Sequence, residues 1–180
     1  MSLEIVLGPM FSGKTSYAIS YIKRQQTIHK HIIAIKPNID SRYSFDSMLM
    51  THNKESYPCI TWDVTQPFYA HNDLLMYDCI VIEEAQFFKN LAETVKLLLF
   101  KNNKHILLVG LNGDANQKTF GEILECIPFS TKLIKLEAFC TVCKDGTPAH
   151  YSKKNETEMT DEQIDIGGSD KYTAVCLKHL

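Results

Sequence analysis

The segment 8–15 constrains the fold of this chain more than any other. It matches the pattern G-x-x-x-x-G-K-[ST], in which glycines let backbone N–H groups close around phosphate oxygens and the following helix adds positive charge at its N-terminus. Alternating apolar residues at 3–7 predict a strand before this loop, and the apolar spacing at 18–22 predicts a helix after it. We therefore expect a nucleoside triphosphate site in which Lys14 reaches the β- and γ-phosphates and Thr15 ligates Mg²⁺. The alternative is an ordinary glycine-rich turn between a strand and a helix.

The apolar segments after this loop predict an α/β fold, with a mostly parallel sheet and helices on both faces. Near-continuous apolar runs at 32–35, 79–82 and 105–110 are typical of buried parallel strands, and a further strand is predicted at 132–136. The helical period at 91–100 separates two of these strands, as in repeated strand-helix-strand units. Ligands of such sheets bind beyond the carboxyl ends of the strands, so polar segments there are candidate site segments.

Two polar segments follow predicted strands in this way. Asp40 and Arg42 lie after the strand at 32–35, where a solvated loop pair is the alternative. Glu83 and Glu84 end the next strand, and an acidic group placed there beside a phosphate loop can reach Mg²⁺ and the γ-phosphate. Because adjacent side chains at a strand end point apart, we expect Glu83 to serve the metal and Glu84 the nucleophile. A solvent-facing glutamate pair is the alternative.

Composition excludes several classes of partner. The 180 residues, 44% of them hydrophobic, carry a formal net charge of −2 with acidic and basic residues interspersed, so no basic surface for nucleic acid or an anionic membrane is predicted. No basic segment precedes an apolar run at the N-terminus, and no apolar stretch approaches the roughly 18 residues of a membrane-spanning helix. We expect a cytoplasmic protein whose six cysteines lie in a reducing compartment.

Four residues near the C-terminus have the spacing of a zinc site. Cys140 and Cys143 form a C-x₂-C pair, and Cys176 and His179 form a C-x₂-H pair. Four protein ligands leave no open position for water, so we expect a structural Zn²⁺ that stabilises the fold without taking part in chemistry. The alternative is a buried cysteine pair beside a frayed C-terminal histidine.

The change of composition near residue 138 predicts a domain boundary. We expect a nucleotide-binding α/β domain at 1–137 and a zinc-binding domain at 138–180. Between the two ligand pairs, the segment 155–172 is long, polar and rich in Glu, Asp and Gly. Anchored at both ends by metal, it is predicted to be a substrate lid, and a disordered segment is the alternative.

Five ordered motifs together resemble the cellular and poxvirus type of thymidine kinase. They are the phosphate loop 8–15, Asp40-Ser41-Arg42-Tyr43, the segment 83–88, Gly110 to Gly113 with Phe120-Gly121, and the segment 167–172. The resemblance covers nearly the whole chain. It implies transfer of the γ-phosphoryl group of ATP to the 5′-hydroxyl of thymidine, for deoxypyrimidine salvage and DNA precursor synthesis. It also implies Mg²⁺, a structural zinc, a homotetramer and feedback inhibition by thymidine triphosphate.

The same resemblance implies roles for single residues. Glu84 would be the general base at the 5′-hydroxyl, with Arg42 and Lys14 as the other catalytic residues, while Glu83 and Thr15 would hold Mg²⁺. The implied nucleotide site comprises Gly8, Pro9, Met10, Phe11, Ser12, Gly13, Lys14, Thr15, Asp40, Ser41, Arg42, Glu83, Glu84, Ala85 and Gln86. The implied thymidine site comprises Met10, Phe87, Leu111, Ala115, Phe120, Ser152, Gln163, Ile164, Asp165, Ile166, Gly167 and Tyr172.

The sequence departs from this family at four places. Glu83 stands where the family usually has Asp, Ala115 where it usually has an aromatic residue, and His179 where it usually has a fourth cysteine. The segment 144–150 is longer than the pattern predicts. These departures bear on substrate range more than on reaction type, and they suggest a divergent member from a large DNA virus that works in the host cytoplasm.

Two other classes of function are compatible with parts of the pattern. One is a switch protein that binds ATP in the phosphate loop and docks a partner through its zinc segment. The other is a zinc-ribbon protein that binds nucleic acid, which the charge balance disfavours. Formation of thymidine monophosphate separates the kinase from both.

Overall fold

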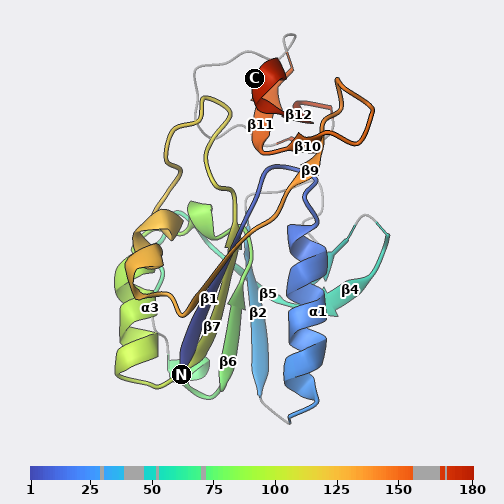
Figure 1. Ribbon diagram of the computed structural model, residues 1–180. Helices are drawn as coiled ribbons and strands as arrows, with labels where there is room; N and C mark the ends of the chain where they lie inside the picture. The colour runs from blue at the N-terminus through green and yellow to red at the C-terminus, as the bar shows by residue number, and fades with distance from the viewer. Residues whose placement is uncertain (29–30, 39–46, 52, 70–71, 156–166, 169) are drawn as a thin grey trace.

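A six-stranded sheet covered by helices forms the body of the molecule, and a small unit of short strands lies beyond one end of it (Figure 1). The computed structural model describes residues 1–28, 31–38, 47–51, 53–69, 72–155, 167–168 and 170–180. The helices α1 (Lys14–Gln26) and α3 (Leu91–Phe100) lie on opposite faces of the sheet. The predicted α/β class with helices on both faces is confirmed.

All neighbouring strands of the main sheet are parallel. Its order is β5-β2-β6-β7-β1-β8, and every pairing between neighbours is parallel. The strands are β1 (Ser2–Leu7), β2 (Ile32–Pro37), β5 (Ile60–Trp62), β6 (Cys79–Ile82), β7 (His105–Gly110) and β8 (Lys132–Lys135). The carboxyl ends of the central strands β6, β7 and β1 therefore meet at one edge, where ligands of such sheets bind.

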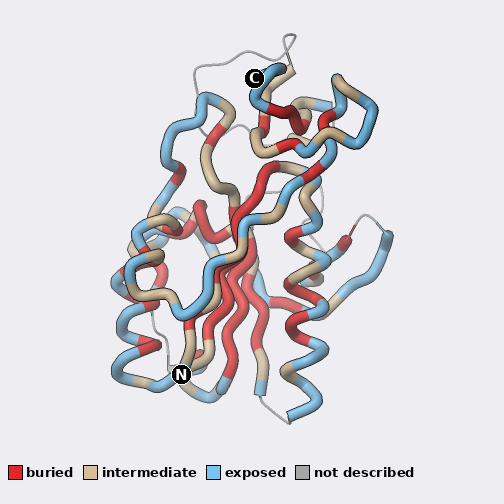
Figure 2. The backbone as a smooth tube through the Cα atoms, in the orientation of Figure 1, coloured by how far each residue is buried: buried red, intermediate tan, exposed pale blue. Residues whose placement is uncertain are grey.

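The strands pack on both faces because successive side chains point to opposite sides. Ile5 and Leu108 belong to the apolar cluster that α3 covers, whereas their neighbours Val6 and Leu107 belong to the cluster that α1 covers. These four residues are fully buried, and Figure 2 shows the central strands as the buried middle of the molecule. Burial on both faces explains why the strands appear in the sequence as continuous apolar runs.

Sequence periodicity gives no clear sign of the elements between 45 and 61. The structure forms an antiparallel pair there, β3 (Met48–Met50) with β4 (Ser56–Pro58), followed by the edge strand β5 of the main sheet. Each of these strands has three residues, and most are exposed or only half-buried. Strands this short show no alternation of apolar and polar residues, so tertiary pairing alone defines them.

The remaining helical elements are short. They are α2 (Asn72–Leu75) and the 3₁₀ helices η2 (Ala85–Phe87), η3 (Ile123–Phe129) and η5 (Leu177–His179). The helix η2 directly follows the two glutamates at the end of β6, so it determines where the next side chains point. Among the described helices, none has the length and apolar character needed to cross a membrane.

The C-terminal unit has a small apolar cluster of its own. Its strands pair antiparallel, β9 (Ala138–Phe139) with β10 (Pro148–Ala149) and β11 (Tyr151–Lys154) with β12 (Tyr172–Val175). The cluster contains only six buried residues, three alanines, one valine and two cysteines. Because these few small side chains bury little apolar surface, a unit of this size needs a covalent or metal cross-link for stability.

Candidate functional site

The predicted phosphate loop lies between β1 and α1, at the carboxyl edge of the sheet. Two of its residues adopt the left-handed backbone conformation, Phe11 with φ 63° and Gly13 with φ 79°. Gly8 is required by close packing, because a Cβ there would lie 2.9 Å from the carbonyl oxygen of Leu136. The sequence therefore folds into a tight loop that leads directly into the first turn of α1.

Lys14 is buried beneath this loop. Its Nζ donates a hydrogen bond to the carbonyl oxygen of Pro9 at 2.7 Å, so the side chain turns back toward the start of the loop. Burial lowers the pKa of Lys14, while the nearby charges of Glu84 and Glu83 oppose that shift. An ammonium group that has lost its water favours anionic partners, as a phosphate-binding lysine requires.

Thr15 and Glu83 meet although they are 68 residues apart in the chain. The Thr15 hydroxyl donates to Oε1 of Glu83, a buried carboxyl group. Burial, together with the adjacent Glu84 charge, raises the pKa of Glu83 to about 7. A hydroxyl and a carboxylate oxygen beside a phosphate loop are the ligand types that Mg²⁺ uses in nucleotide sites, so these two residues fit the predicted metal site.

Glu84 has an unusual backbone conformation for its residue type. Its φ is 50°, a left-handed conformation that is uncommon for a residue other than glycine. Its Oε2 accepts a hydrogen bond of 2.6 Å from Nε2 of Gln86, and the residue is half-buried. The two carboxyl groups therefore have separate hydrogen-bond partners, Thr15 for Glu83 and Gln86 for Glu84.

Two aromatic rings lie next to this carboxylate pair. Phe87 follows Gln86 in η2 and packs edge-on against Phe120, with ring centroids 5.1 Å apart. Leu111 is joined to the same region, because its backbone N–H donates to Oε1 of Gln86 at 3.1 Å. Three residues expected in the thymidine site, Phe87, Leu111 and Phe120, are thus linked around Gln86.

A second group of predicted thymidine-site residues comes from the phosphate loop and the C-terminal unit. The backbone N–H of Met10 donates to the buried Ser152 hydroxyl at 2.9 Å. Tyr172 lies half-buried on β12, the partner strand of β11, which carries Ser152. The carbonyl of Ala115 accepts from Nε2 of its neighbour Gln117 at 2.6 Å, a contact local to that loop.

Cys140, Cys143, Cys176 and His179 form one cluster whose ligand atoms all lie within 4.8 Å of one another. Nδ1 of His179 lies 3.6, 3.3 and 3.4 Å from the three sulfurs in chain order, and the sulfurs of Cys143 and Cys176 are 3.8 Å apart. Tetrahedral Zn²⁺ separates two sulfurs by about 3.8 Å, and a sulfur from a nitrogen by about 3.6 Å. Burial by itself would raise the pKa of Cys140, but hydrogen bonds from the backbone N–H groups of Cys143 and Cys176 outweigh it. The pKa of Cys140 falls to about 6, which favours the thiolate.

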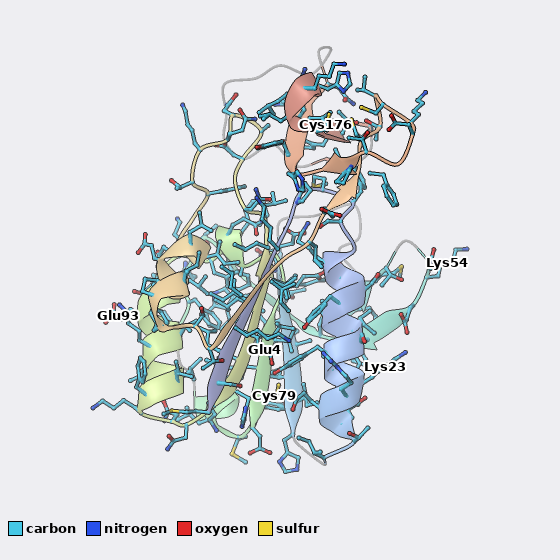
Figure 3. The ribbon with its side chains drawn as sticks, in the orientation of Figure 1. Glu4, Lys23, Lys54, Cys79, Glu93 and Cys176 are labelled. Atoms are coloured by element: carbon cyan, nitrogen blue, oxygen red, sulfur yellow. The ribbon has the colours of Figure 1, made fainter. Side chains whose placement is uncertain are left out.

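The six cysteines therefore divide into two groups. Cys176 lies in the C-terminal unit, far from Cys79 near the opposite end of the sheet (Figure 3). Cys79, Cys59 and Cys126 are buried in the main body, and burial raises the pKa of Cys59 to about 11 and that of Cys126 to about 12. Only the C-terminal group, among the described residues, has the geometry of a metal site.

Comparison with known proteins decides the family. The family model described as thymidine kinase matches residues 1–180. The chain belongs to the thymidine kinase family. It is 33% identical to the thymidine kinase of Choristoneura fumiferana entomopoxvirus, over 98% of this chain and 94% of that protein. It is also 33% identical to thymidine kinase a of Arabidopsis thaliana, over 99% and 74% of the two chains, and 35% identical to thymidine kinase 1 of Dictyostelium discoideum, over 97% and 75%.

The family resemblance inferred from the motifs is thus confirmed. In this member of the thymidine kinase family, the structure brings the phosphate loop, Glu83 with Glu84, and Gln86 to one edge of the sheet. The remaining predicted residues, Asp40, Ser41, Arg42, Gln163, Ile164, Asp165 and Ile166, lie outside the described residues. Gly167 is described and half-buried.

Two features of this thymidine kinase family site are absent from the sequence pattern. The carbonyl of Pro9 holds the side chain of Lys14, and no local signal could have indicated that contact. Gln86, expected only among nucleotide-binding residues, instead joins Glu84 to the backbone of Leu111. Its position two residues after a carboxylate was the only available hint.

Proposed function

We propose that this chain transfers the γ-phosphoryl group of ATP to the 5′-hydroxyl of thymidine. The observation that carries the proposal is the meeting of Lys14, Glu83 and Glu84 at one strand edge of a chain that matches the thymidine kinase family throughout. A phosphate-binding lysine, a candidate metal ligand and a separate carboxylate are the groups that phosphoryl transfer to an alcohol requires.

The residues of the site divide the work among them. Loop N–H groups and Lys14 would bind the β- and γ-phosphates, so Lys14 would exchange its bond with the Pro9 carbonyl for phosphate oxygens. Thr15 and Glu83 would hold Mg²⁺, which supplies charge neutralisation between the β- and γ-phosphates when bound. Glu84 would accept the proton of the 5′-hydroxyl as that oxygen bonds to the γ-phosphorus, while the bond from the γ-phosphorus to the β–γ bridging oxygen breaks and ADP leaves. Arg42 remains a predicted partner of that oxygen.

The thymidine pocket would lie between two groups of residues, the first containing Phe87 and Phe120 and the second Met10 and Ser152. Phe87 and Phe120 offer an edge-to-face aromatic wall, which suits stacking against a flat pyrimidine ring. Met10 and Ser152 would close the opposite side, next to the phosphate loop. The segment 163–167 remains the predicted lid, and its backbone groups would pair with the base edge. The small side chain of Ala115 would leave more room at this pocket than an aromatic residue.

The C-terminal cluster would hold one structural Zn²⁺. Four protein ligands complete a tetrahedral shell, so this metal would stabilise residues 138–180 and take no part in phosphoryl transfer. A nucleotide-binding domain would then span 1–137 and a zinc-binding domain 138–180. A homotetramer, inhibition by thymidine triphosphate and a cytoplasmic location are the further properties that the resemblance implies.

A product assay tests the proposal directly. The protein is incubated with ATP, Mg²⁺ and thymidine, and thymidine monophosphate is separated from the substrates and quantified. Parallel reactions contain deoxyuridine, deoxycytidine or no nucleoside, so that ADP formed by hydrolysis is distinguished from ADP formed by transfer. We expect monophosphate and ADP in equal amounts with thymidine. Hydrolysis of ATP without any nucleoside monophosphate would contradict the proposal and favour a switch protein.

A further inference from the structure

Gln86 is the most completely buried polar side chain beside the proposed base. Only 2% of its surface is exposed, and both ends of its amide are used. Nε2 donates to Oε2 of Glu84 at 2.6 Å, and Oε1 accepts from the backbone N–H of Leu111 at 3.1 Å. With so little exposed surface, the residue is better placed to act through Glu84 than to contact a nucleotide directly.

The Leu111 backbone fixes which way the amide of Gln86 faces. A backbone N–H can only donate, so the amide oxygen must lie on the Leu111 side. The NH₂ group is then directed at Glu84, where it meets a carboxylate that can only accept. If the amide were rotated by half a turn, its NH₂ group would face the N–H of Leu111 and its oxygen would face the Glu84 carboxylate, and neither hydrogen bond could form. The arrangement therefore presents a donor to Glu84 in one orientation only.

Two glycines leave the space that Gln86 occupies. A Cβ at Gly110 would lie 2.5 Å from the Oε1 atom of Gln86, so only glycine lets the amide approach the end of β7. A Cβ at Gly121 would lie 1.9 Å from the carbonyl oxygen of Gln86, and Gly121 has φ 60°. Both the side chain and the backbone of Gln86 are thus packed against positions that cannot carry a side chain.

We propose that Gln86 is a positioning residue that sets the rotamer of Glu84 for proton transfer. The inference rests on the proposed function, in which Glu84 is the base. Glu84 is half-buried, and among the described residues its carboxylate accepts one hydrogen bond, the one from Gln86. The amide occupies Oε2 and leaves Oε1 for the 5′-hydroxyl. Because the same amide binds Leu111, the base and one wall of the thymidine pocket are held by a single side chain.

A double-mutant cycle tests this role. The values of kcat, and of KM for thymidine and for ATP, are measured for the wild type, Gln86→Met, Glu84→Gln and the double variant. Methionine matches glutamine in length and flexibility but supplies no donor. We expect Gln86→Met to lower kcat about 10- to 100-fold, since a hydrogen bond to a charged group is lost. Both KM values should change by less than about 3-fold, and in the Glu84→Gln background the further loss of kcat should be under about 2-fold.

Two more variants keep the test decisive. Gln86→Asn keeps a neutral amide but is one methylene shorter, so its donor no longer reaches Glu84, and it should also lower kcat. This variant carries the test if Gln86→Met does not fold. Gln66→Leu, at an exposed glutamine, is the matched control and should behave as the wild type.

The outcomes separate this inference from the proposed function. An equal loss of kcat from Gln86→Met in both backgrounds, a change confined to KM, or unchanged kinetics would overturn the positioning role while the wild type remains active. A wild type that forms no thymidine monophosphate would overturn the proposed function, and this role with it.

Discussion

The Ser152 hydroxyl accepts a hydrogen bond from the backbone N–H of Met10, 142 residues away in the chain. Met10 lies in the phosphate loop, and Ser152 lies on β11, whose partner strand β12 runs directly into Cys176. One hydrogen bond therefore connects the Cys/His cluster to the nucleotide site. Whatever holds the cluster together also fixes one backbone group of the phosphate loop.

Removing this hydroxyl should weaken both the fold and nucleotide binding. In Ser152→Ala the N–H of Met10 loses its partner in a part-buried site, which costs about 1–3 kcal/mol. We expect a lower Tm and a several-fold weaker affinity for ATP, measured by thermal denaturation and by titration calorimetry. Ser16→Ala, at an exposed serine on α1, is the control and should change neither. Unchanged ATP affinity in Ser152→Ala would contradict the connection.

Glu84→Gln should separate chemistry from binding. The amide keeps the size of the side chain but cannot take a proton, so we expect kcat to fall about 10²- to 10⁴-fold. The affinity for ATP, measured without thymidine, should stay close to that of the wild type, because Lys14 and the loop are unchanged. Turnover near the wild-type rate would remove Glu84 from the role of base. Glu93→Gln, on the exposed face of α3, controls for loss of charge.

Glu83 should make the stability of the nucleotide-free protein depend on pH. Its pKa of about 7 in the folded protein lies above the ordinary value of 4.5, so the folded state holds this proton more tightly than the unfolded state. The resulting stability is fully present below pH 4.5 and is lost as the pH rises through 7. The loss amounts to about 3 kcal/mol at most.

Glu83→Gln isolates this contribution. Its amide does not titrate, so the variant does not lose this contribution as the pH rises. Between pH 5 and 8 the Tm of the wild type should therefore fall relative to the Tm of the variant. The measurement is a series of thermal melts without nucleotide, with Glu93→Gln as the control. Parallel pH profiles for Glu83→Gln and the wild type would show that Glu83 titrates normally.

Loss of one cluster ligand should release the metal. Cys143→Ser removes a thiolate from the four-ligand group, and we expect bound zinc to fall from about one ion per chain to nearly none. The Tm should fall as well, because the C-terminal unit has only a small core. Zinc is measured by atomic emission after dialysis. Cys59→Ala, at a buried cysteine outside the cluster, should keep its zinc, and full zinc content in Cys143→Ser would exclude the site.

Much of the architecture was accessible from the sequence because its signals are local. The phosphate loop is a contiguous pattern with a strand before it and a helix after it, and the buried strands are continuous apolar runs. The zinc ligands come in two chelating pairs, so only the meeting of the pairs had to be inferred. The short strand β5 has no such signal, because its three residues are exposed or half-buried.

The sequence by itself determined the chemistry available to this protein: a glycine-framed phosphate loop, an acidic pair after a buried strand and two metal-binding pairs. The tertiary structure decided which of these groups meet. Thr15 reaches Glu83, Met10 reaches Ser152, and Gln86 is held between Glu84 and Leu111. The reason is that local patterns report the preferences of a short stretch of backbone, whereas these contacts depend on strand order and register across the whole sheet.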